Sequence, residues 1–322
     1  MNKLFAIGEA LIDFIPNERD SKLKEVSQFQ PQVGGAPTNV ASCVAKLGGK
    51  ASIITQVGED AFGEKIEDTL NSIDVDTNYL MKTDKATTAL AFVSLTKEGE
   101  RDFAFYRKPS ADMLLKTENL PELQFDSTDI LHFCSVDLVE SPMKQTHAEV
   151  IDKMLNADGT VIFDPNLRFP LWDSLEDLRK TVLEFIPKAH ILKISDEELE
   201  FITNIKDKNE AIESLFVGNV EIIIYTEGKN GASIYTKNGM IAHENGFEVT
   251  VKDTTGAGDA FIGAIIFQLL KEDRKHLTVN GNQYLRFANA VGGVTTTAYG
   301  AIESLPYLED VEKLVNHSEA NE

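Results

Sequence analysis

The 322-residue chain has little of three things that mark whole classes of protein: cysteine, positive charge and long apolar runs. Its two cysteines, Cys43 and Cys134, are too few for a disulfide framework, and their apolar surroundings indicate buried, reduced thiols. Lysine and arginine total 31 against 52 aspartates and glutamates, which gives a net charge of −21. A surface this acidic disfavours nucleic acid and anionic membranes as partners, whereas a nucleotide can still bind where a pocket is locally positive.

The longest apolar run, from Ala260 to Leu270, contains Gln268 and is far shorter than the ~20 residues that a membrane helix needs. The apolar residues at the N-terminus run directly into Glu9 and Asp13, which is too short and too charged a stretch for an export signal. We therefore expect a cytoplasmic protein with no membrane span and no nucleic-acid partner.

Short apolar runs with strand character alternate with amphipathic helical patterns. The runs expected to form strands are 4–7, 51–57, 129–134, 160–163, 191–194 and 220–226. The patterns expected to form helices are 38–47, 62–72, 141–155, 175–186, 197–203 and 209–216. This alternation predicts an α/β fold with a parallel sheet, helices on both faces, and ligands beyond the carboxyl ends of the strands.

Two segments interrupt the alternation. Residues from about 10 to 33 lack a helical pattern, while 87–96 and 101–107 alternate polar and apolar side chains around a charged loop at 97–100, as a hairpin does. We expect the segments at about 10–33 and 86–108 to form a small sheet that covers the open edge of the pocket. The whole chain, 1–322, is then one domain with this sheet as its lid.

A glycine-rich turn at 253–259, Asp-Thr-Thr-Gly-Ala-Gly-Asp, lies between a run with strand character at 247–251 and an apolar helical run. Gly256 and Gly258 let the backbone approach a ligand, and the helix start supplies unpaired N–H groups and a positive dipole end. The motif therefore predicts an anion site. Asp259 is either a helix cap or a catalytic group, and a cap alone would not need the two glycines.

A second pair of glycines, Gly34 and Gly35, precedes Pro37 at the expected start of the first helix. This arrangement is either an ordinary tight turn or a place where the backbone approaches a small polar ligand. In the second case Asn39, on the first turn of the helix, faces that ligand.

Three further motifs follow expected strands. In Asp-Pro-Asn-Leu-Arg at 164–168, a turn sequence, Arg168 is a candidate phosphate contact. Ser-Asp-Glu-Glu at 195–198 is either a capping box or a site where Glu198 contacts Mg²⁺ or phosphate-bound water. Thr-Glu-Gly-Lys-Asn-Gly at 226–231 carries glycines that suit a nucleotide lying on the backbone.

In this order, the motifs resemble the ribokinase-like carbohydrate kinase family, also called the phosphofructokinase-B family. The resemblance covers the chain from Gly8 to Pro306, and the segments at 8–13 and 100–114 are similar to the fructokinase branch. The family implies a Rossmann-like core, a small β-sheet lid, and transfer of the γ-phosphate of ATP to a primary hydroxymethyl group.

The resemblance also implies roles for matching residues. Asp259 matches the catalytic base, and the turn of Gly256, Ala257 and Gly258 matches the anion hole, with Arg168 as a further charge-stabilising group. The implied sugar contacts are Asp13, Gly34, Gly35, Asn39 and Asp259. The expected nucleotide contacts are Lys193, Ser195, Thr226, Gly228, Gly231, Gly256, Gly258 and Asn289.

Alternation along the strand expected at 101–107 places Phe103, Phe105 and Arg107 on one face. These residues either cover the sugar, with Arg107 as a polar hook, or form the small core of the lid. The other face and the edges of the lid sheet are exposed, and we expect two lids to pair and bury them in a homodimer.

The implied cofactors are ATP, Mg²⁺ and K⁺. Glu198 is the candidate Mg²⁺ contact. The segments at 253–255 and 295–304 are either plain loops or a K⁺ site. In the second case the candidate ligands are Asp253, Thr255, Thr295, Ala298, Gly300 and Ser304. The chain departs from the family at Ser195, where asparagine is usual, and at Glu227, where an apolar residue is usual. The first departure weakens the transfer of a metal site to Ser195.

The leading interpretation is an ATP-dependent fructokinase that forms fructose 6-phosphate. A kinase for 2-keto-3-deoxygluconate shares much of the pattern, and the carboxylate of that acid sugar would need a cation such as Arg107. A non-catalytic sugar or nucleotide sensor would be free to lose Asp259, Gly256 or Gly258, and all three are present.

Overall fold

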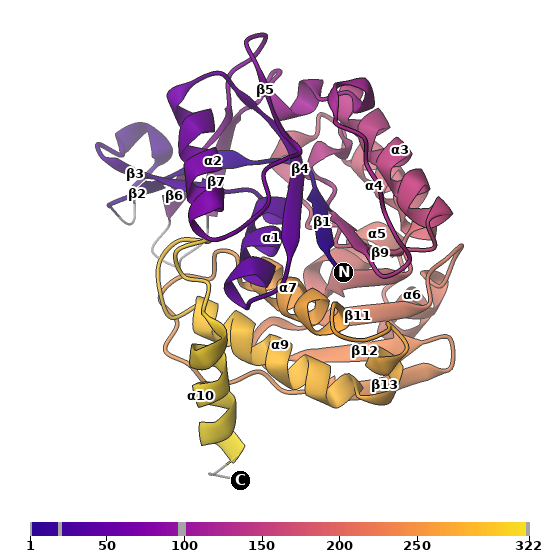
Figure 1. Ribbon diagram of the computed structural model, residues 1–322. Helices are drawn as coiled ribbons and strands as arrows, with labels where there is room; N and C mark the ends of the chain where they lie inside the picture. The colour runs from indigo at the N-terminus through magenta and orange to yellow at the C-terminus, as the bar shows by residue number, and fades with distance from the viewer. Residues whose placement is uncertain (1, 19–20, 96–100, 320–322) are drawn as a thin grey trace.

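The computed structural model describes residues 2–18, 21–95 and 101–319, and these residues form two sheets with helices around the larger one (Figure 1). The strands of the large sheet are β1 (Leu4–Ile7), β4 (Ala51–Gly58), β5 (Leu80–Thr83), β8 (Ile130–Phe133), β9 (Thr160–Phe163), β10 (Ile191–Ser195), β11 (Ile222–Thr226), β12 (Ala232–Thr236) and β13 (Gly239–Glu244). Their order is β13-β12-β11-β10-β9-β8-β1-β4-β5. Neighbours from β11 to β5 are parallel, and β12 and β13 add an antiparallel edge.

The central strands are buried on both faces, and in β1 apolar side chains occupy every position. Leu4 and Ala6 of β1 pack into one core, and Phe5 and Ile7 pack into the other. The predicted parallel α/β sheet is confirmed, and each predicted core strand is present to within two residues.

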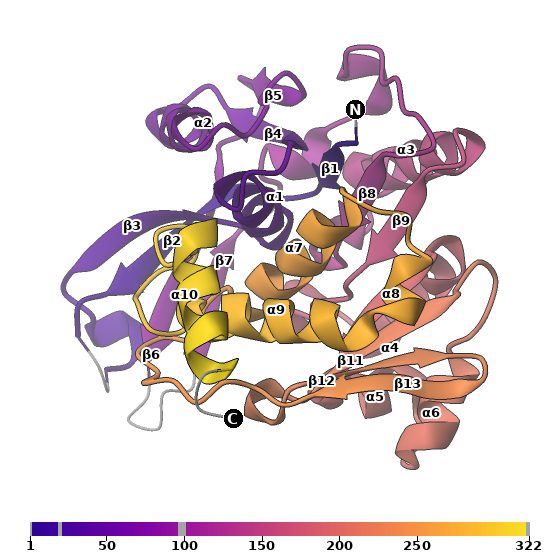
Figure 2. The same cartoon turned by 60° about the horizontal axis from the view of Figure 1, so that its bottom comes forward.

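Helices cover both faces of this sheet (Figures 1 and 2). Those whose side chains build the first core are α1 (Ala36–Lys46), α2 (Ala61–Ser72), α7 (Ala257–Leu269) and α9 (Gly281–Thr295). Those that build the second are α3 (Pro142–Asn156), α4 (Leu175–Phe185), α5 (Asp196–Thr203) and α6 (Lys208–Ser214). The short α8 (His276–Val279) and the C-terminal α10 (Leu308–Glu319) pack beside α9. No described helix has both the length and the apolar character needed to cross a membrane.

The two interrupting segments form the small sheet. Its strands are β2 (Leu11–Pro16), β3 (Phe29–Gly34), β6 (Ala89–Leu95) and β7 (Arg101–Tyr106), in the order β3-β2-β6-β7. The predicted hairpin is the antiparallel β6–β7 pair, and its loop at 97–100 lies outside the described residues. Because β2 follows β1 after a few residues, the small sheet lies at the carboxyl-terminal end of the large one, where ligands are expected.

The strand predicted at 247–251 is wrong, because these residues form no strand. Phe247 and Val249 instead line a pocket, and Phe247 packs against the first core. The alternating apolar residues of this run therefore line a pocket and do not pack in a sheet.

Candidate active site

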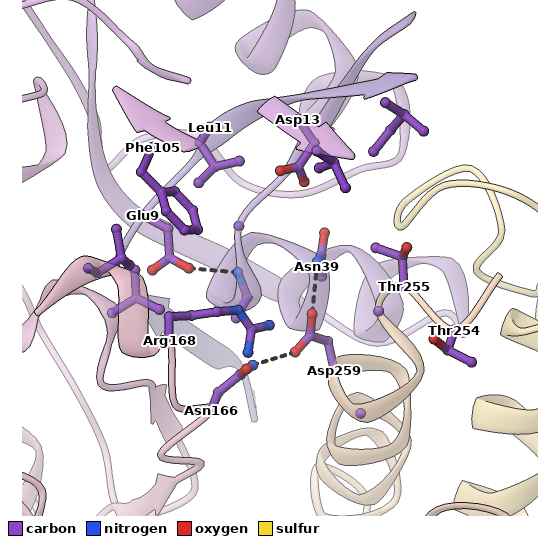
Figure 3. Close-up of a pocket in the computed structure, with 18 of the residues that line it drawn as sticks. Glu9, Leu11, Asp13, Asn39, Phe105, Asn166, Arg168, Thr254, Thr255 and Asp259 are labelled. Atoms are coloured by element: carbon purple, nitrogen blue, oxygen red, sulfur yellow. Dashed lines mark hydrogen bonds between the residues drawn. The ribbon is translucent and has the colours of Figure 1, made fainter. Parts of the chain in front are cut away.

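The carboxylate of Asp259 lies in the first turn of α7 and is 6% exposed. Helix α7 starts after Gly256, whose φ of +73° turns the chain into the helix. The side-chain amide of Asn39 donates to Oδ2 of Asp259 at 2.8 Å, and that of Asn166 donates to Oδ1 at 2.9 Å (Figure 3). Burial raises the pKa of Asp259, and these bonds together with Arg168 and Lys193 oppose the rise.

A cavity of about 200 Å³, with both polar and apolar lining residues, opens above Asp259 (Figure 3). Among the predicted sugar contacts, the residues that line it are Asp13, Gly35, Asn39, Phe105 and Asp259. Gly34 lies behind Asp13, and a side chain at position 34 would collide with the Asp13 carboxylate. Arg168, Gly256 and Gly258 also line the cavity, so it joins the sugar contacts to the expected anion site.

Arg107 is placed differently from the predicted polar hook. Strand β7 ends at Tyr106, and the buried Arg107 guanidinium forms ion pairs with Asp112 and Asp137 instead of lining the cavity. Burial alone would lower the pKa of Arg107, but Asp112, Asp137 and Glu9 raise it, so the side chain stays charged. The Phe103 side chain lies outside the described residues.

Glu9 is a cavity residue that sequence reasoning missed. Its Oε1 accepts the Ala36 N–H at 2.8 Å, and its backbone carbonyl accepts the Thr38 hydroxyl at 2.9 Å. The carboxylate thereby caps α1, because the N-cap residue Gly35 has no side chain to do so. Burial raises the pKa of Glu9 to about 7, against the opposing charge of Arg107. The motif at 8–13 contained Glu9, but nothing local in it indicated a cap for a helix 27 residues away.

A second, larger cavity of about 870 Å³ adjoins the first. The predicted nucleotide contacts that line it are Lys193, Ser195, Thr226, Gly228, Gly231, Gly258 and Asn289. Gly256 lines the first cavity instead. The Asn289 side chain donates to the carbonyls of Glu244 and Asn245 at 3.1 and 3.0 Å, which fixes the wall between α9 and β13.

Lys193, Thr254 and Gly258 line both cavities, so the two spaces meet at the start of α7. The Lys193 ammonium lies 3.1 Å from Oδ1 of Asp164, a residue at the end of β9 that is completely buried. A ligand oxygen at this junction would meet the ammonium and the first amides of α7, which together form an anion site.

Ser195 and Glu198 form the capping box at the start of α5. Oε2 of Glu198 accepts the N–H and hydroxyl of Ser195, both at 2.9 Å, and Oε1 accepts the Leu167 N–H at 2.8 Å. Both oxygens of Glu198 therefore have donors within the protein, which favours the capping role over direct contact with Mg²⁺. No group of three or more His, Cys, Asp or Glu residues in the described ranges is arranged to hold a metal ion.

The residues predicted to enclose K⁺ lie on two adjoining loops, except Thr295, which is the last residue of α9. The Asp253 carboxylate accepts the N–H and hydroxyl of Thr255 at 3.0 and 2.7 Å, and the N–H of Gly300 at 3.1 Å. The Ser304 hydroxyl donates to the Gly300 carbonyl. Thr295 is fully buried and donates to the Val291 carbonyl, and Ala298 lies on the loop that follows α9. Asp253 thus joins the loops, whose carbonyl oxygens are of the kind that binds cations.

The smaller cavity meets the larger one at the expected anion site, and the hydrogen-bonded carboxylate of Asp259 lies beside it. This arrangement is that of a kinase for small hydroxylated substrates. A family model described as pfkB family carbohydrate kinase matches residues 1–308. The chain is 42% identical over 304 residues to probable fructokinase-2 of Arabidopsis thaliana, which covers 94% of this chain and 92% of the relative.

The chain is also similar to solved structures of fructokinases. The fructokinase of Xylella fastidiosa with bound ATP matches with a TM-score of 0.89 and 32% identity, over 98% of this chain and 99% of that one. A double mutant of the Vibrio cholerae fructokinase, bound to fructose, ADP and a potassium ion, matches with a TM-score of 0.87 and 32% identity, over 98% of each chain. The chain belongs to the pfkB family of carbohydrate kinases, and its fold is the ribokinase-like α/β fold.

Proposed function

We propose that the protein is an ATP-dependent fructokinase that transfers the γ-phosphate of ATP to a primary hydroxyl of D-fructose and forms fructose 6-phosphate. The observation that carries this proposal is the position of Asp259, whose held carboxylate faces the smaller cavity where that cavity meets the larger one. Relatives named fructokinases along nearly the whole chain support the choice of sugar.

The residues at the junction suit phosphoryl transfer. Asp259 takes the proton of the attacking hydroxyl, which strengthens the oxygen as a nucleophile. Lys193, Arg168 and the amides of Gly258 and its neighbours stabilise the charge on the transferring group. The small sheet acts as the lid and keeps water from the reaction.

Mg²⁺ arrives with ATP in this proposal, held mainly through phosphate oxygens and water, as is usual for nucleotide enzymes. K⁺ binds between the loops at 253–255 and 295–304. We also propose a cytoplasmic homodimer that pairs through the small sheet.

The state of Arg107 argues against a 2-keto-3-deoxygluconate kinase. A sugar carboxylate would have to attract a guanidinium that already pairs with Asp112 and Asp137 inside the protein. It would also enter a cavity lined by the carboxyl groups of Glu9, Asp13 and Asp259, where we assign the two cations, Arg168 and Lys193, to the transferring phosphoryl group. A neutral ketose avoids both costs, since its hydroxyls can donate to these oxygens.

The test is a coupled ADP-release assay with fructose, tagatose, ribose, glucose and 2-keto-3-deoxygluconate, with ³¹P and ¹³C NMR of the product. We expect the highest kcat/KM for fructose and phosphate on C6. Asp259→Asn should lower kcat about 10²- to 10⁴-fold and leave fructose binding nearly intact. A higher kcat/KM for the acid sugar, or near wild-type turnover by Asp259→Asn, would contradict the proposal.

A further inference from the structure

Asn166 has a backbone conformation that residues with side chains rarely adopt. Its φ of +46° lies in the left-handed region, which asparagine tolerates better than most residues. The residue belongs to the turn that follows β9, and its side chain lines the smaller cavity. A conformation of this kind at a site persists only where the surrounding structure imposes it.

Three neighbours of Asn166 fix the turn. The Pro165 carbonyl accepts the Ser135 N–H at 3.0 Å, and the Leu167 N–H donates to Glu198 at 2.8 Å. Asp164 pairs with Lys193 of β10. Because the turn is anchored on both sides of residue 166, its side chain leaves the backbone from a fixed point and in a fixed direction.

The Asn166 amide and the Asn39 amide approach Asp259 from different parts of the chain (Figure 3). One donates to Oδ1 at 2.9 Å and the other to Oδ2 at 2.8 Å. Two neutral donors, one on each oxygen, favour the charged carboxylate over the protonated acid and also fix the plane of the group.

We propose that Asn166 is a positioning residue for phosphoryl transfer, whose amide, together with that of Asn39, holds the Asp259 carboxylate ionised and oriented toward the sugar hydroxyl. This inference rests on the proposed kinase function and deepens it. Asn39 and Asn166 differ in what they can bind besides Asp259. Oδ1 of Asn39 is buried and has no hydrogen-bond partner among the described residues, so it can accept a sugar hydroxyl. The Asn166 amide is assigned only its hydrogen bond to Asp259.

The other groups around Asp259 make each amide donor important. Burial raises the pKa of Asp259, and the positive charges that oppose the rise come from Arg168 and Lys193. The carboxyl of Asp164 and the buried thiols of Cys43 and Cys134 also face this region. The raising effect of burial outweighs the lowering effect of the donors and cations, so the pKa of Asp259 is raised. Loss of one donor would raise this pKa further, toward the pH at which the enzyme works.

The main variant for the test is Asn166→Gly, because glycine accepts the left-handed backbone without strain and removes only the amide. The matched control is Asn204→Gly, which makes the same change at the left-handed residue after α5, with φ of +56°, outside both cavities. For both variants and the wild type, kcat and the KM for fructose are measured from pH 5.5 to 9, together with thermal melting.

We expect Asn166→Gly to shift the acid limb of kcat upward by about one pH unit, so kcat should fall about 10-fold at pH values below that limb and progressively less above it. The KM for fructose should change less than about threefold, because Asn39 keeps its sugar contact. Asn166→Asp should shift the limb further, since two carboxyl groups would share a proton. Asn204→Gly should match the wild type in all three measurements.

A second readout does not depend on the substrate. The ¹³C carboxyl shift of Asp259, assigned by its loss in Asp259→Asn, is followed against pH in the wild type and in Asn166→Gly, and we expect a higher pKa in the variant. An unchanged Asp259 titration overturns the inference, as does an increase in fructose KM with an unmoved acid limb, which would make Asn166 a sugar contact. Failure of the wild type to phosphorylate fructose would instead overturn the proposed function and leave the NMR result to decide the role of Asn166.

Discussion

Lys193 and Asp164 form a buried ion pair at the junction of the two cavities, with the ammonium 3.0 Å from Oδ2 of the carboxylate. Burial would lower the pKa of Lys193, but Asp164 and Glu198 raise it, so the lysine stays charged. Burial also raises the pKa of Asp164 to about 7, although Lys193 opposes the rise. The pair therefore places a cation at the junction of the two cavities, where we propose that the phosphoryl group is transferred.

We expect Lys193→Met to lower kcat about 10²- to 10³-fold, because a charge that stabilises the transferring phosphoryl group is lost. The variant also leaves the Asp164 carboxyl buried without its cation, so its loss of stability should be larger at pH 8 than at pH 5, where the carboxyl can protonate. The double variant Lys193→Met/Asp164→Asn should recover stability but not turnover. Recovery of both would show that Lys193 acts only on the fold, and kcat and urea unfolding at the two pH values make the distinction.

Arg107 and Arg168 should respond oppositely to the same substitution. Arg107→Met removes the cation from the buried carboxylates of Asp112 and Asp137, and breaking such a cluster typically costs about 3–5 kcal/mol of unfolding free energy. Arg168→Met removes a cation from the cavity wall and should lower kcat/KM about 10²-fold with little loss of stability. Urea unfolding and steady-state kinetics separate the two effects. A stable Arg107→Met variant with a raised fructose KM would restore the direct sugar contact that the sequence suggested.

Most of the fold could be predicted because its determinants are local. The apolar strands, the helix start at Pro37 and the turn around Gly256 each carry their signal within a few residues. The partners of Arg107 could not be found in this way. Alternation predicts which side chains share a face within a strand. Because β7 ends at Tyr106, Arg107 lies beyond the strand and the alternation does not apply to it. Asp137, one of the carboxylates that neutralise Arg107, is 30 residues further along the chain.

The site shows the same limit. Asp259 and its glycines form a contiguous motif and were predicted together. Asn166 was part of a predicted turn, but its contact with Asp259 spans 93 residues and follows from the order of β9 and α7 in space. Glu9 reads as part of a strand end, and only the packing of α1 beside β1 reveals that it caps that helix.

Glu9 should make the stability of the protein depend on pH. Its pKa rises from 4.5 to about 7 on folding, so the folded state binds the proton more tightly than the unfolded state does. The contribution to stability is therefore complete below pH 4.5 and is lost as the pH rises through about 7, a change of about 3 kcal/mol. Glu9→Gln cannot titrate and should become more stable relative to the wild type between pH 5 and pH 8. A constant difference in unfolding free energy across this range would contradict the assignment.

The outer face of the small sheet carries the prediction of a dimer. Phe14, Phe92 and Tyr106 lie on the strand positions opposite to those that line the cavity, and their rings form one cluster with Phe29. Tyr106 is 65% exposed, as expected of a residue that a second copy covers. We expect a dimer in sedimentation velocity at micromolar concentration and a monomer for Tyr106→Glu. Met240→Glu, at a residue of similar exposure on the far edge strand β13, is the control and should remain dimeric.

Activity should depend on a monovalent cation of the right size. The loops at 253–255 and 295–304 are joined through Asp253, and Gly256, which starts the anion site, lies against Ala301 of the second loop. A K⁺ ion held by carbonyl oxygens of these loops would fix the turn that carries the first amides of α7, without touching either substrate. Turnover should therefore rise on the order of tenfold when K⁺ replaces tetramethylammonium at constant ionic strength, with KM values little changed.

The same site gives the control for this prediction. Asp253→Asn weakens the link between the loops and should reduce the response to K⁺, whereas Asp273→Asn, an equivalent change at a residue remote from both loops, should leave it intact. K⁺ should also raise the melting temperature of the wild type, because an ion that binds only the folded state stabilises it. Equal turnover in K⁺, Na⁺ and tetramethylammonium would mean that the loops are structural and that Asp253 alone holds the turn.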